Sequence, residues 1–566
     1  MSKVLADLLY PHVEKSLDDW MVQYPPRALP EGAQVTRFAP SPTGFVHIGS
    51  IFTSLISRRT AHQTGGVFIL RIEDTDKKRE KDGSVEEIVR NLINFDLTPD
   101  EGITQIDPER EIGAYAPYTQ SERVAEYEAF AKFLVERGLA YPAFDTEEEL
   151  ERLRKIQEAQ RLKPGYYGSF AKWRDAKIDA VQAELDKGNR PVIRIRAPNP
   201  SEARIKFIDV VKGAMDMPIN DQDSVLVKSN RLPTYHFAVV VDDTLMRVNL
   251  VVRGDEWLPS APLHLQLYEY FGLPAPRFAH IAPIATMDNV IGEDGQAHAS
   301  KRKLSKRKDP EANVMYFYEQ GYPKAAVTEY LLNLANSSFY DWRKANPSAP
   351  NADFQLRIEN MGVASPLFDV VKLNDISKEI IATYNAEQVY DAGVTWARQY
   401  QPRLAALLER NKDYSLRVFS VERGGAAPRK DIVNWSDIER ACGLFFDERY
   451  DETIAATGYP FPEKVPAADV ARILEHVLAF DLVRTKDEWL TDMRDFSESV
   501  GYARDVKSFK KNPDAYKGQF GDVMMVVRVA LSGKTNTPDL YEILQTLGAV
   551  RAYGRLRAAL AQIERA

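Results

Sequence analysis

Residues 37–50 read RFAPSPTGFVHIGS, and this stretch decides the fold. It overlaps a short run, VTRF, whose β-branched and aromatic residues are typical of a β-strand. Pro40 and Pro42 end that strand because proline has no backbone N–H to donate, and Gly44 allows a tight turn. A helical pattern follows from His47, and then an apolar run, VFILRIED, indicates another strand. The order strand, turn, helix, strand predicts a parallel α/β sheet with helices on its faces.

The composition is that of an ordinary soluble globular protein of several domains. A chain of 566 residues is too long for one core, and its length predicts about three to five domains. No signal peptide and no run of about 18 apolar residues is found, so we expect a cytoplasmic protein without a membrane partner. The one cysteine, Cys442, excludes a disulfide within the chain, and its apolar neighbours predict a buried thiol.

A strongly basic run stands out in this acidic chain. Six of the eight residues in 301–308 are basic, although the formal net charge is -8. The run could be a targeting signal, a patch for a nucleic-acid backbone, or a loop that handles phosphate. Lys303 and Lys306 can converge on a triphosphate while Ser305 donates a hydrogen bond. Taken alone, such a run is more often a solvated loop, and the net negative charge argues against DNA binding.

Two further motifs carry chemistry and also have plainer explanations. In HIGS, His47 and Gly49 stand at the opening of a helix, where free N–H groups favour phosphate, but the histidine could simply cap the helix. In VVRGDEW, Arg253 stands at a strand end, where open α/β sheets bind ligands. Trp257 in the same motif is more often a packing residue than a base-stacking one. The acids of RIEDTD could equally cap a helix.

The remaining sequence indicates an α/β half followed by a helical half. Residues 1–33 predict a short helix and a Pro-rich connector. Helical stretches and strands alternate from about 136 to 230, which indicates an inserted α/β module. The sheet is expected to resume at YHFAVVVDD and then LVVRGDEW, both interpreted as strands. Beyond about residue 320, amphipathic helices predominate.

Together and in this order, five stretches resemble the bacterial glutamyl-tRNA synthetases of class I: RFAPSPTGFVHIGS, FILRIEDTD, LPTYHFAVVVDD, VVRGDEW and SKRKLSKRKD. The resemblance is dense from about residue 34 to 340 and looser beyond. HIGS stands in place of the class signature HIGH, with Ser50 at its last position. KLSKR stands in place of KMSKS, with Leu304 and Arg307 as departures. The basic run is thereby interpreted as the second ATP signature and not as a targeting signal.

The resemblance implies a class I Rossmann-like α/β catalytic domain with a parallel sheet, an inserted α/β acceptor-binding module, and an all-helical stem-contact and anticodon-binding region. The expected segments are an N-terminal helical extension (1–33), the first half of the catalytic domain (34–135), the inserted module (136–230), the second half with the KLSKR loop (231–310), a stem-contact helical domain (311–385) and a helical anticodon-binding region (386–566).

The implied activity is that of a glutamate–tRNA ligase. The α-carboxylate of L-glutamate attacks the α-phosphorus of ATP, which forms glutamyl-adenylate and releases pyrophosphate. The 3′-terminal adenosine of tRNA(Glu) then takes the glutamyl group and releases AMP. This route needs no covalent enzyme intermediate, so catalysis would rest on positioning and charge stabilisation. Mg²⁺ is expected to accompany ATP, held mainly by the triphosphate and water.

The resemblance also implies roles for twelve residues. The catalytic residues would be His47, Lys303 and Lys306, which neutralise the triphosphate. The ATP-binding residues would be Thr43, His47, Gly49, Glu256, Trp257 and Lys306. Two arginines suit the carboxylates of glutamate because a guanidinium binds a carboxylate bidentately, and an acid suits the ammonium. The glutamate-binding residues would therefore be Arg37, Ser41, Glu73, Tyr235 and Arg253. Those arginines would reject glutamine, whose neutral amide leaves positive charge uncompensated.

We expect no metal site in the protein itself. Some relatives carry a zinc-binding cysteine cluster in the inserted module, but the matching stretch here, GLAYPAFDTEEEL, has Tyr141, Phe144 and Asp145 and no cysteine. We therefore predict no structural zinc. The expected state is a monomer, and charging of tRNA(Gln) beside tRNA(Glu) stays open. Arg551, Arg555 and Arg557 could contact phosphates, although arginines on exposed helices are usually only solvated.

Four other classes of protein share some of these features. A glutaminyl-tRNA synthetase shares the signatures but typically has a β-barrel anticodon region. The helical pattern of the C-terminal part of this chain argues against it. The shortened paralogue that glutamylates a modified tRNA base lacks roughly 200 of the residues present here. A catalytically dead RNA-binding relative would not be expected to retain His47, Lys303, Lys306 and Arg253. Small nucleotidyltransferases use HIGH-like turns but would not need the helical C-terminal third.

Overall fold

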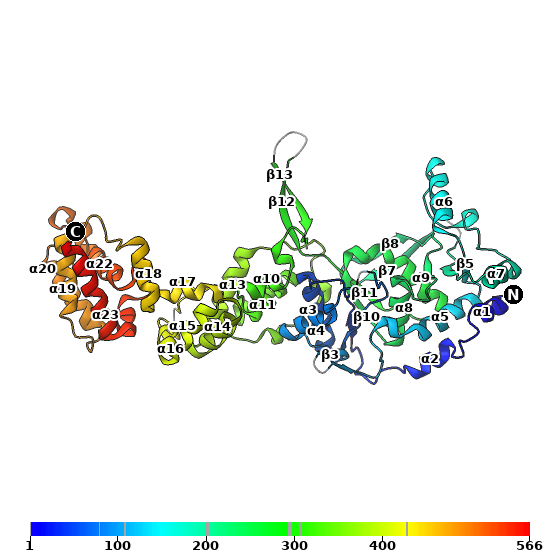
Figure 1. The fold of residues 1–566 in the computed structure, drawn as a ribbon, viewed down its shortest axis with the longest axis horizontal. Helices are drawn as coiled ribbons and strands as arrows, with labels where there is room; N and C mark the ends of the chain where they lie inside the picture. Colours follow the sequence, from blue (N-terminus) through cyan, green and yellow to red (C-terminus); the bar gives the residue numbers. More distant parts are fainter. Residues whose placement is uncertain are drawn as a thin grey trace. The chain divides into compact units, whose positions relative to one another are not determined.

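The computed structural model describes residues 2–78, 80–106, 109–198, 203–291, 297–305, 307–425 and 428–565. The chain forms two compact units. The first comprises Met1–Tyr316 and Leu331–Phe368, and the second comprises Phe317–Tyr330 and Asp369–Ala566. Figure 1 follows the elements along the chain.

The centre of the first unit is a parallel sheet, as RFAPSPTGFVHIGS predicts. β1 pairs in parallel with β2, and β10 pairs in parallel with β11. Asn249 joins the two pairs, because its N–H donates to the Val35 carbonyl and its side chain accepts from the Val35 N–H. The carboxyl ends of these strands therefore share one edge. The elements are β1 (Val35–Phe38), α3 (Ile48–Gln63), β2 (Val67–Leu70), β10 (Leu250–Gly254), α9 (Ala261–Phe271) and β11 (Arg277–Ile281).

The stretch YHFAVVVDD is not a strand, contrary to the sequence-based expectation. It lies in the helix α8 (Tyr235–Leu245), which begins after Thr234. Nearly every residue from Phe237 to Leu245 is buried, so the helix carries no polar face that would reveal its period. A continuous apolar run does not distinguish a buried helix from a buried strand, and packing overrides the weak helix propensity of three valines.

The other elements of the first unit surround this sheet. β7 pairs with β11 as well as with β8, so this hairpin, which lies within 136–230, extends the sheet of β10 and β11. The remaining elements are α1 (Ser2–Leu9), α2 (Leu17–Gln23), α4 (Ser84–Asn94), β3 (Gly102–Ile106), β4 (Glu109–Ile112), α5 (Val124–Glu136), β5 (Ala140–Ala143), α6 (Glu147–Ala159), α7 (Ile178–Asp186), β6 (Val192–Ile195), β7 (Arg204–Asp209), β8 (Gly213–Pro218), β9 (Val225–Val227) and α12 (Ser338–Ala345). The division between the two units falls within α10 (Met315–Glu319).

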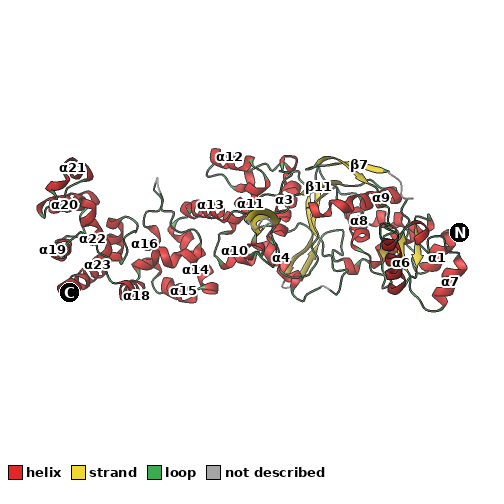
Figure 2. Ribbon diagram, turned by 90° about the horizontal axis from the view of Figure 1, so that it is seen from above, coloured by secondary structure: helices red, strands yellow, loops and turns green. Residues whose placement is uncertain are grey.

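Two local expectations need correction. The N-terminal segment forms two helices, because Ser16 and Asp19 build a capping box that starts α2. The basic run is not a loop throughout. Its first residues, through Lys303, belong to β13 (Ala297–Lys303), which pairs antiparallel with β12 (Ala285–Ile291) as a hairpin. Figure 2 shows strands and helices in different colours.

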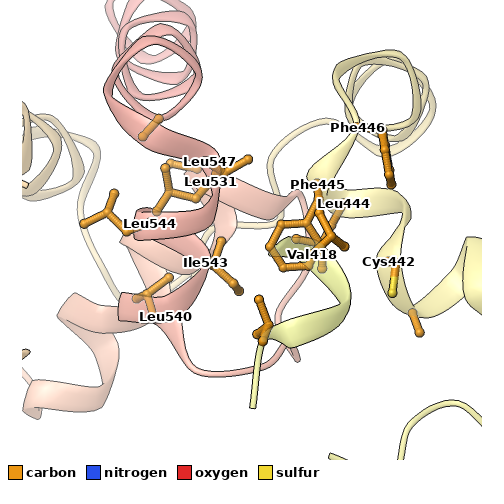
Figure 3. Packing of buried hydrophobic residues seen from close by; sticks show 14 of the residues in the cluster. Val418, Cys442, Leu444, Phe445, Phe446, Leu531, Leu540, Ile543, Leu544 and Leu547 are labelled. Carbon is orange, nitrogen blue, oxygen red and sulfur yellow. The ribbon is translucent and has the colours of Figure 1, made fainter. Parts of the chain in front are cut away.

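The described part of the second unit consists of helices and no strands, as expected (Figures 1 and 2). One apolar core runs through it, and Figure 3 shows the part around Val418, Phe445 and Ile543. Cys442 lies in this core and is fully buried, which confirms the predicted structural thiol. The longer helices are α11 (Lys324–Ala335, shared between the units), α13 (Val370–Thr383), α14 (Ala386–Tyr400), α15 (Pro402–Glu409), α16 (Lys412–Ser420), α18 (Asp447–Thr457), α19 (Ala467–Leu478), α20 (Lys486–Ser499), α22 (Phe520–Ser532) and α23 (Leu540–Arg565).

Candidate functional site

A cavity of 450 Å³ opens at the carboxyl ends of β1, β10 and β11. This is the edge where open parallel sheets bind ligands. Helix α3 contributes its first turn, α8 its N-terminus, and the β12–β13 hairpin its base. Ten of the twelve predicted site residues line the cavity: Arg37, Ser41, His47, Gly49, Glu73, Tyr235, Arg253, Glu256, Trp257 and Lys303.

The other two predicted residues lie elsewhere. Thr43 does not line the cavity; its backbone N–H donates to the Ser41 carbonyl at 2.8 Å within the turn. Lys306 lies outside the described residues. Leu304, between the two signature lysines, is buried and lines the cavity, which anchors the start of the loop.

His47 both caps helix α3 and lines the cavity, so the two explanations of HIGS are compatible. Its Nδ1 accepts a hydrogen bond from the Gly49 N–H at 2.9 Å. A Cβ at residue 49 would come within 2.9 Å of that Nδ1, so glycine is required for this approach. Because Nδ1 accepts, a neutral imidazole carries its proton on Nε2. The first turn of α3 thus offers an N–H donor and a helix N-terminus, both suited to phosphate oxygens.

Arg37 is one of two buried arginines that share Asp243. Its Nε donates to the Asp243 carboxylate at 3.2 Å. Arg71, fully buried, donates to the same carboxylate at 2.7 Å and to Glu73 at 3.2 Å. Although burial disfavours the charge of Asp243, the two guanidinium groups hold its pKa below the ordinary value. The guanidinium of Arg37 is therefore fixed at the cavity wall by a buried carboxylate.

Glu73 is a buried acid at the cavity wall, and its acidity is strongly changed. Burial raises its pKa to about 7, and the nearby charges of Arg71 and Arg37 offset only part of this effect. A carboxyl group that titrates near neutrality would gain its full charge when a cation such as an ammonium enters the cavity.

Arg253 is held by imidazole groups rather than by a carboxylate. Its Nε donates to Nε2 of His280 at 3.0 Å, and its Nη1 lies 3.1 Å from Nδ1 of His264. Its Nη2 is buried and has no hydrogen-bond partner among the described residues. Arg253 lines the cavity, so this donor group is available to a ligand.

Aromatic and ionic contacts form the outer part of the cavity. The rings of Tyr235 and Trp257 lie 4.4 Å apart at an angle of 34°. Burial raises the pKa of Tyr235 to about 12, so its hydroxyl stays a donor. Lys303 forms an ion pair with Glu256 at 2.5 Å. Although burial disfavours the charge of Glu256, the hydrogen bond from Lys303 holds its pKa below the ordinary value.

Sequence reasoning missed the residues behind the cavity wall. They are Arg71, Asp209, Asp243, His264 and His280. Arg71 and Asp243 stand in two of the five stretches that resemble the synthetases. The sequence therefore indicates their segments but not these two residues. The two histidines and Asp209 belong to no motif, and only the pairing of β7 with β11 brings Asp209 to His280.

The inserted segment is held together by hydrogen bonds around a buried acid. Asp223 accepts from the Tyr141 hydroxyl at 2.5 Å and from Arg174 at 2.6 Å, and Asp145 accepts from Tyr166 at 2.6 Å. Among the described residues, no group of three or more His, Cys, Asp or Glu side chains is placed to hold a metal ion. In the same described part of the chain, no helix is long and apolar enough to span a membrane.

Two family profiles match the chain. Residues 34–340 match "tRNA synthetases class I (E and Q), catalytic domain", and residues 432–560 match "Anticodon binding domain". The chain is 45% identical over 558 residues to a glutamate–tRNA ligase of Clostridium perfringens, covering 98% of this chain and 99% of the relative. It is 44% identical to a glutamate–tRNA ligase of Sorangium cellulosum, covering 95% and 97%.

Solved structures agree with the sequence matches. The crystal structure of a glutamate tRNA ligase from Elizabethkingia meningosepticum in complex with its amino acid is similar with a TM-score of 0.73 and 26% sequence identity. The similarity covers 94% of this chain and 99% of that one. A glutamate–tRNA synthetase structure from Elizabethkingia anophelis gives a TM-score of 0.71 at the same identity.

Proposed function

The chain belongs to the glutamate–tRNA ligases, class I tRNA synthetases, and from this premise we propose how its cavity serves the reaction. The enzyme attaches L-glutamate to the 3′ end of tRNA with ATP as the energy source. The single observation that carries the proposal is that one cavity is lined both by groups complementary to glutamate and by residues of HIGS and the start of KLSKR.

The inner part of the cavity would bind L-glutamate. Arg37 and Arg253 supply guanidinium groups for the two carboxylates, because each can form charge-assisted hydrogen bonds there. Glu73 supplies the carboxylate for the ammonium group, and Ser41 and Tyr235 add hydroxyl donors. The burial of Arg37, Glu73 and Arg253 supports these roles, since buried charges interact strongly and reject a partner without charge.

The outer part would bind ATP. His47 and the first turn of α3 face the phosphates, and Gly49 lets the nucleotide approach the backbone. Lys303 and Lys306 would neutralise the triphosphate, while Glu256, Trp257 and Thr43 would contact the nucleoside. Mg²⁺ bound to the triphosphate would supply further positive charge. Triphosphate oxygens and water would be its main ligands.

Catalysis then follows from positioning and charge. Arg37, Arg253 and Glu73 hold glutamate so that its α-carboxylate meets the α-phosphorus, which removes much of the entropic cost of the encounter. His47 and the lysines stabilise the negative charge that accumulates as pyrophosphate leaves. No nucleophilic side chain takes part, in agreement with the burial of Cys442.

The remaining segments would bind tRNA. Residues 136–230 would hold the acceptor end next to the cavity, residues 311–385 would contact the stem, and residues 386–566 would read the anticodon. The match of residues 432–560 to an anticodon-binding domain supports the last assignment. We further propose that the enzyme acts as a monomer, with tRNA(Glu) as substrate and tRNA(Gln) as a second candidate.

ATP–pyrophosphate exchange tests the amino acid and the nucleotide together. Exchange that depends on glutamate, and that strictly requires tRNA, is expected. Exchange with glutamine in place of glutamate would instead indicate a glutaminyl enzyme. Charging of purified tRNA(Glu) and tRNA(Gln) transcripts then decides whether one or both are substrates.

The KLSKR assignment is tested by Lys306→Ala. The variant should lose adenylation while its thermal melting stays that of the wild type, because the lysine would contact only the triphosphate. Lys308→Ala, in the same basic run, is the matched control and should remain active. Turnover of Lys306→Ala close to that of the wild type would refute the role.

A further inference from the structure

Arg253 lies at the centre of a chain of buried polar groups that the proposed reaction does not by itself explain. His264 and His280, 1% and 0% exposed, flank its guanidinium. Beyond His280, Nδ1 lies 2.6 Å from the Asp209 carboxylate; beyond His264, Nε2 lies 3.0 Å from Nδ1 of His236. The order is Asp209, His280, Arg253, His264, His236.

The hydrogen bonds in this chain define the tautomer of each central imidazole. A guanidinium has only donors, so the ring nitrogens that face Arg253 must be unprotonated acceptors. His280 therefore carries its proton on Nδ1 and donates to Asp209. His264 carries its proton on Nε2 and donates to His236. Both imidazoles are thus neutral while they hold the arginine.

Arg253 differs in this respect from the other two arginines of the wall. Arg37 and Arg71 each form an ion pair with Asp243. Arg253 forms no ion pair with any described carboxylate, and burial lowers its pKa. A carboxylate is the usual partner of a buried guanidinium, because the pair compensates the charge. Two neutral acceptors instead fix the group and leave its positive charge without a directly paired anion, although Asp243 and Tyr235 lie near enough to favour the charge.

The orientation of Arg253 leaves its Nη2 amino group, with two N–H donors, for a ligand. Its Nε and Nη1 are used by His280 and His264, whereas the buried Nη2 is unpartnered. Such a group costs free energy until an acceptor arrives, and a charged acceptor compensates it best. Arg37 already forms an ion pair with Asp243. A ligand amide in place of a carboxylate beside Arg37 therefore leaves less positive charge without a partner. The uncompensated Arg253 therefore discriminates more strongly between a carboxylate and an amide.

We propose that His264 and His280 are positioning residues that hold Arg253 as an uncompensated cation, and that this arrangement selects the side-chain carboxylate of glutamate over the amide of glutamine. The inference rests on the proposed function and extends it to residues behind the cavity wall. Its essential element is the neutrality of the two imidazoles, since an anionic group in either place would satisfy Arg253 before the substrate enters.

The matched variants His264→Asn and His264→Asp test this neutrality. In both, an oxygen replaces Nδ1 as the acceptor for Arg253, and the two side chains differ in charge but hardly in shape. His264→Asn should keep the KM for glutamate within about threefold of the wild type. His264→Asp should raise it roughly tenfold to hundredfold, because the aspartate compensates the charge of Arg253 and weakens its charge-assisted hydrogen bond to the substrate. The preference for glutamate over glutamine should narrow by a similar factor, with the KM for ATP unchanged in both variants.

Equal effects of the two substitutions would show that His264 only fills space, and would overturn the proposal. An equal rise of the KM for glutamate and for glutamine in His264→Asp would likewise contradict the assignment of Arg253 to the side-chain carboxylate. If wild-type protein shows no glutamate-dependent exchange at all, the proposed function itself fails.

A second measurement needs no activity and no folded aspartate variant. Nitrogen-15 NMR of wild-type protein labelled at histidine should show two neutral rings, one protonated on Nδ1 and one on Nε2, between pH 6 and 8. The signals are assigned from their disappearance in His264→Asn and His280→Gln. An imidazolium at either position in that range would overturn the proposal, whatever the exchange assay gives.

Discussion

Single residues in the cavity show how burial sets acidity. The pKa of Glu73 is raised to about 7 from its ordinary value of 4.5, because its charge is buried. The charged form is therefore disfavoured in the empty cavity. Between pH 4.5 and 7 the native chain holds this proton while the unfolded chain has released it, so the contribution of Glu73 to stability falls as pH rises. Because its pKa lies near neutrality, Glu73 should also make glutamate binding depend on pH.

Glutamate binding should weaken as the pH falls below 7. The ammonium of the substrate needs an ionised Glu73, so below pH 7 the carboxyl group must first release its proton. Each further pH unit should raise the KM for glutamate up to about tenfold. The measurement is the KM in ATP–pyrophosphate exchange from pH 5.5 to 8. Glu73→Gln serves as the control, since it should bind poorly and lose this pH step. A flat KM in the wild type would refute the role of Glu73.

Residues with motifs could be found from the sequence, and residues without motifs could not. Arg37, His47, Arg253 and Lys303 stand in short signatures where strands or helices begin and end, and the cavity brings them together. His264 and His280 lie inside ordinary apolar segments. Their role depends on which strands pair in the sheet, and a single sequence does not show that pairing.

At the scale of elements, the β12–β13 hairpin holds the start of the KLSKR loop. Arg302 donates to Asp288 on the partner strand. Its Nη1 and Nη2 also donate to the two carboxylate oxygens of Asp309, beyond the loop, at 2.5 and 2.8 Å. Asp309 also accepts from the Ser305 N–H at 2.7 Å. The sequence leaves open whether Arg302 holds the loop near anionic ligands or faces solvent. In the structure Arg302 clamps the start of the loop, because it contacts carboxylates on both sides of it.

Loosening this clamp should affect ATP and spare glutamate. Arg302→Lys keeps the charge but loses the fork that binds two carboxylates. We expect a fall in kcat/KM for ATP of up to about hundredfold, since small displacements of positioned groups are costly. The KM for glutamate should stay unchanged. The control is Lys301→Ala on the same strand. If Arg302→Lys leaves kcat/KM for ATP unchanged, the contacts of Arg302 with the two carboxylates do not contribute to ATP use.

The elements also show where pattern reasoning fails. The strands β1 and β2 and the helix α3 follow directly from the prolines, the glycine and the alternation of residue types. α8 was misassigned because burial on nearly all sides hides the helical period. Tertiary packing decides such segments, and local propensity does not.

Helix α23 contains an arginine whose role is structural. Arg555 is 5% exposed and donates to the carbonyls of Leu444 and Leu531 and to the Asp447 carboxylate. With these partners, the Arg555 guanidinium is not available to contact a phosphate of tRNA. Arg555→Ala should lower the free energy of unfolding of the second unit by about 3 kcal/mol, because it leaves buried carbonyls unpaired and a cavity. Arg557→Ala, on the exposed face, is the control. Melting curves compare them, and equal stability would contradict this role.

At the scale of the whole molecule, residues 1–33 pack against the catalytic core rather than forming a separate domain. The guanidinium of Arg27 binds both carboxylate oxygens of Glu101, at 2.6 and 2.8 Å, and lies over the Tyr115 ring. The Tyr118 hydroxyl donates to the same Glu101. Arg247 in turn donates to the carbonyls of Met21 and Tyr24. The N-terminal segment is thus joined to two distant parts of the first unit.

Arg27→Ala should therefore destabilise the first unit. The substitution leaves the partly buried Glu101 carboxylate with the Tyr118 hydroxyl but without its guanidinium partner, which costs about 3 kcal/mol. Urea denaturation of the variant measures this loss, and Lys3→Ala, an exposed residue of α1, should behave as the wild type. A variant as stable as wild type would mean that the N-terminal segment contributes little to the core.

The isolation of Cys442 gives the molecule a practical property. It is the one cysteine in the chain, it is fully buried, and burial raises the pKa of its thiol, so it should not react with maleimides. Cysteines introduced at the exposed positions Val22 and Val483, one in each unit, would then be the sole labelling sites. A donor and an acceptor fluorophore at these positions would make the native chain a single-molecule reporter of the distance between Val22 and Val483 while tRNA is bound, charged and released.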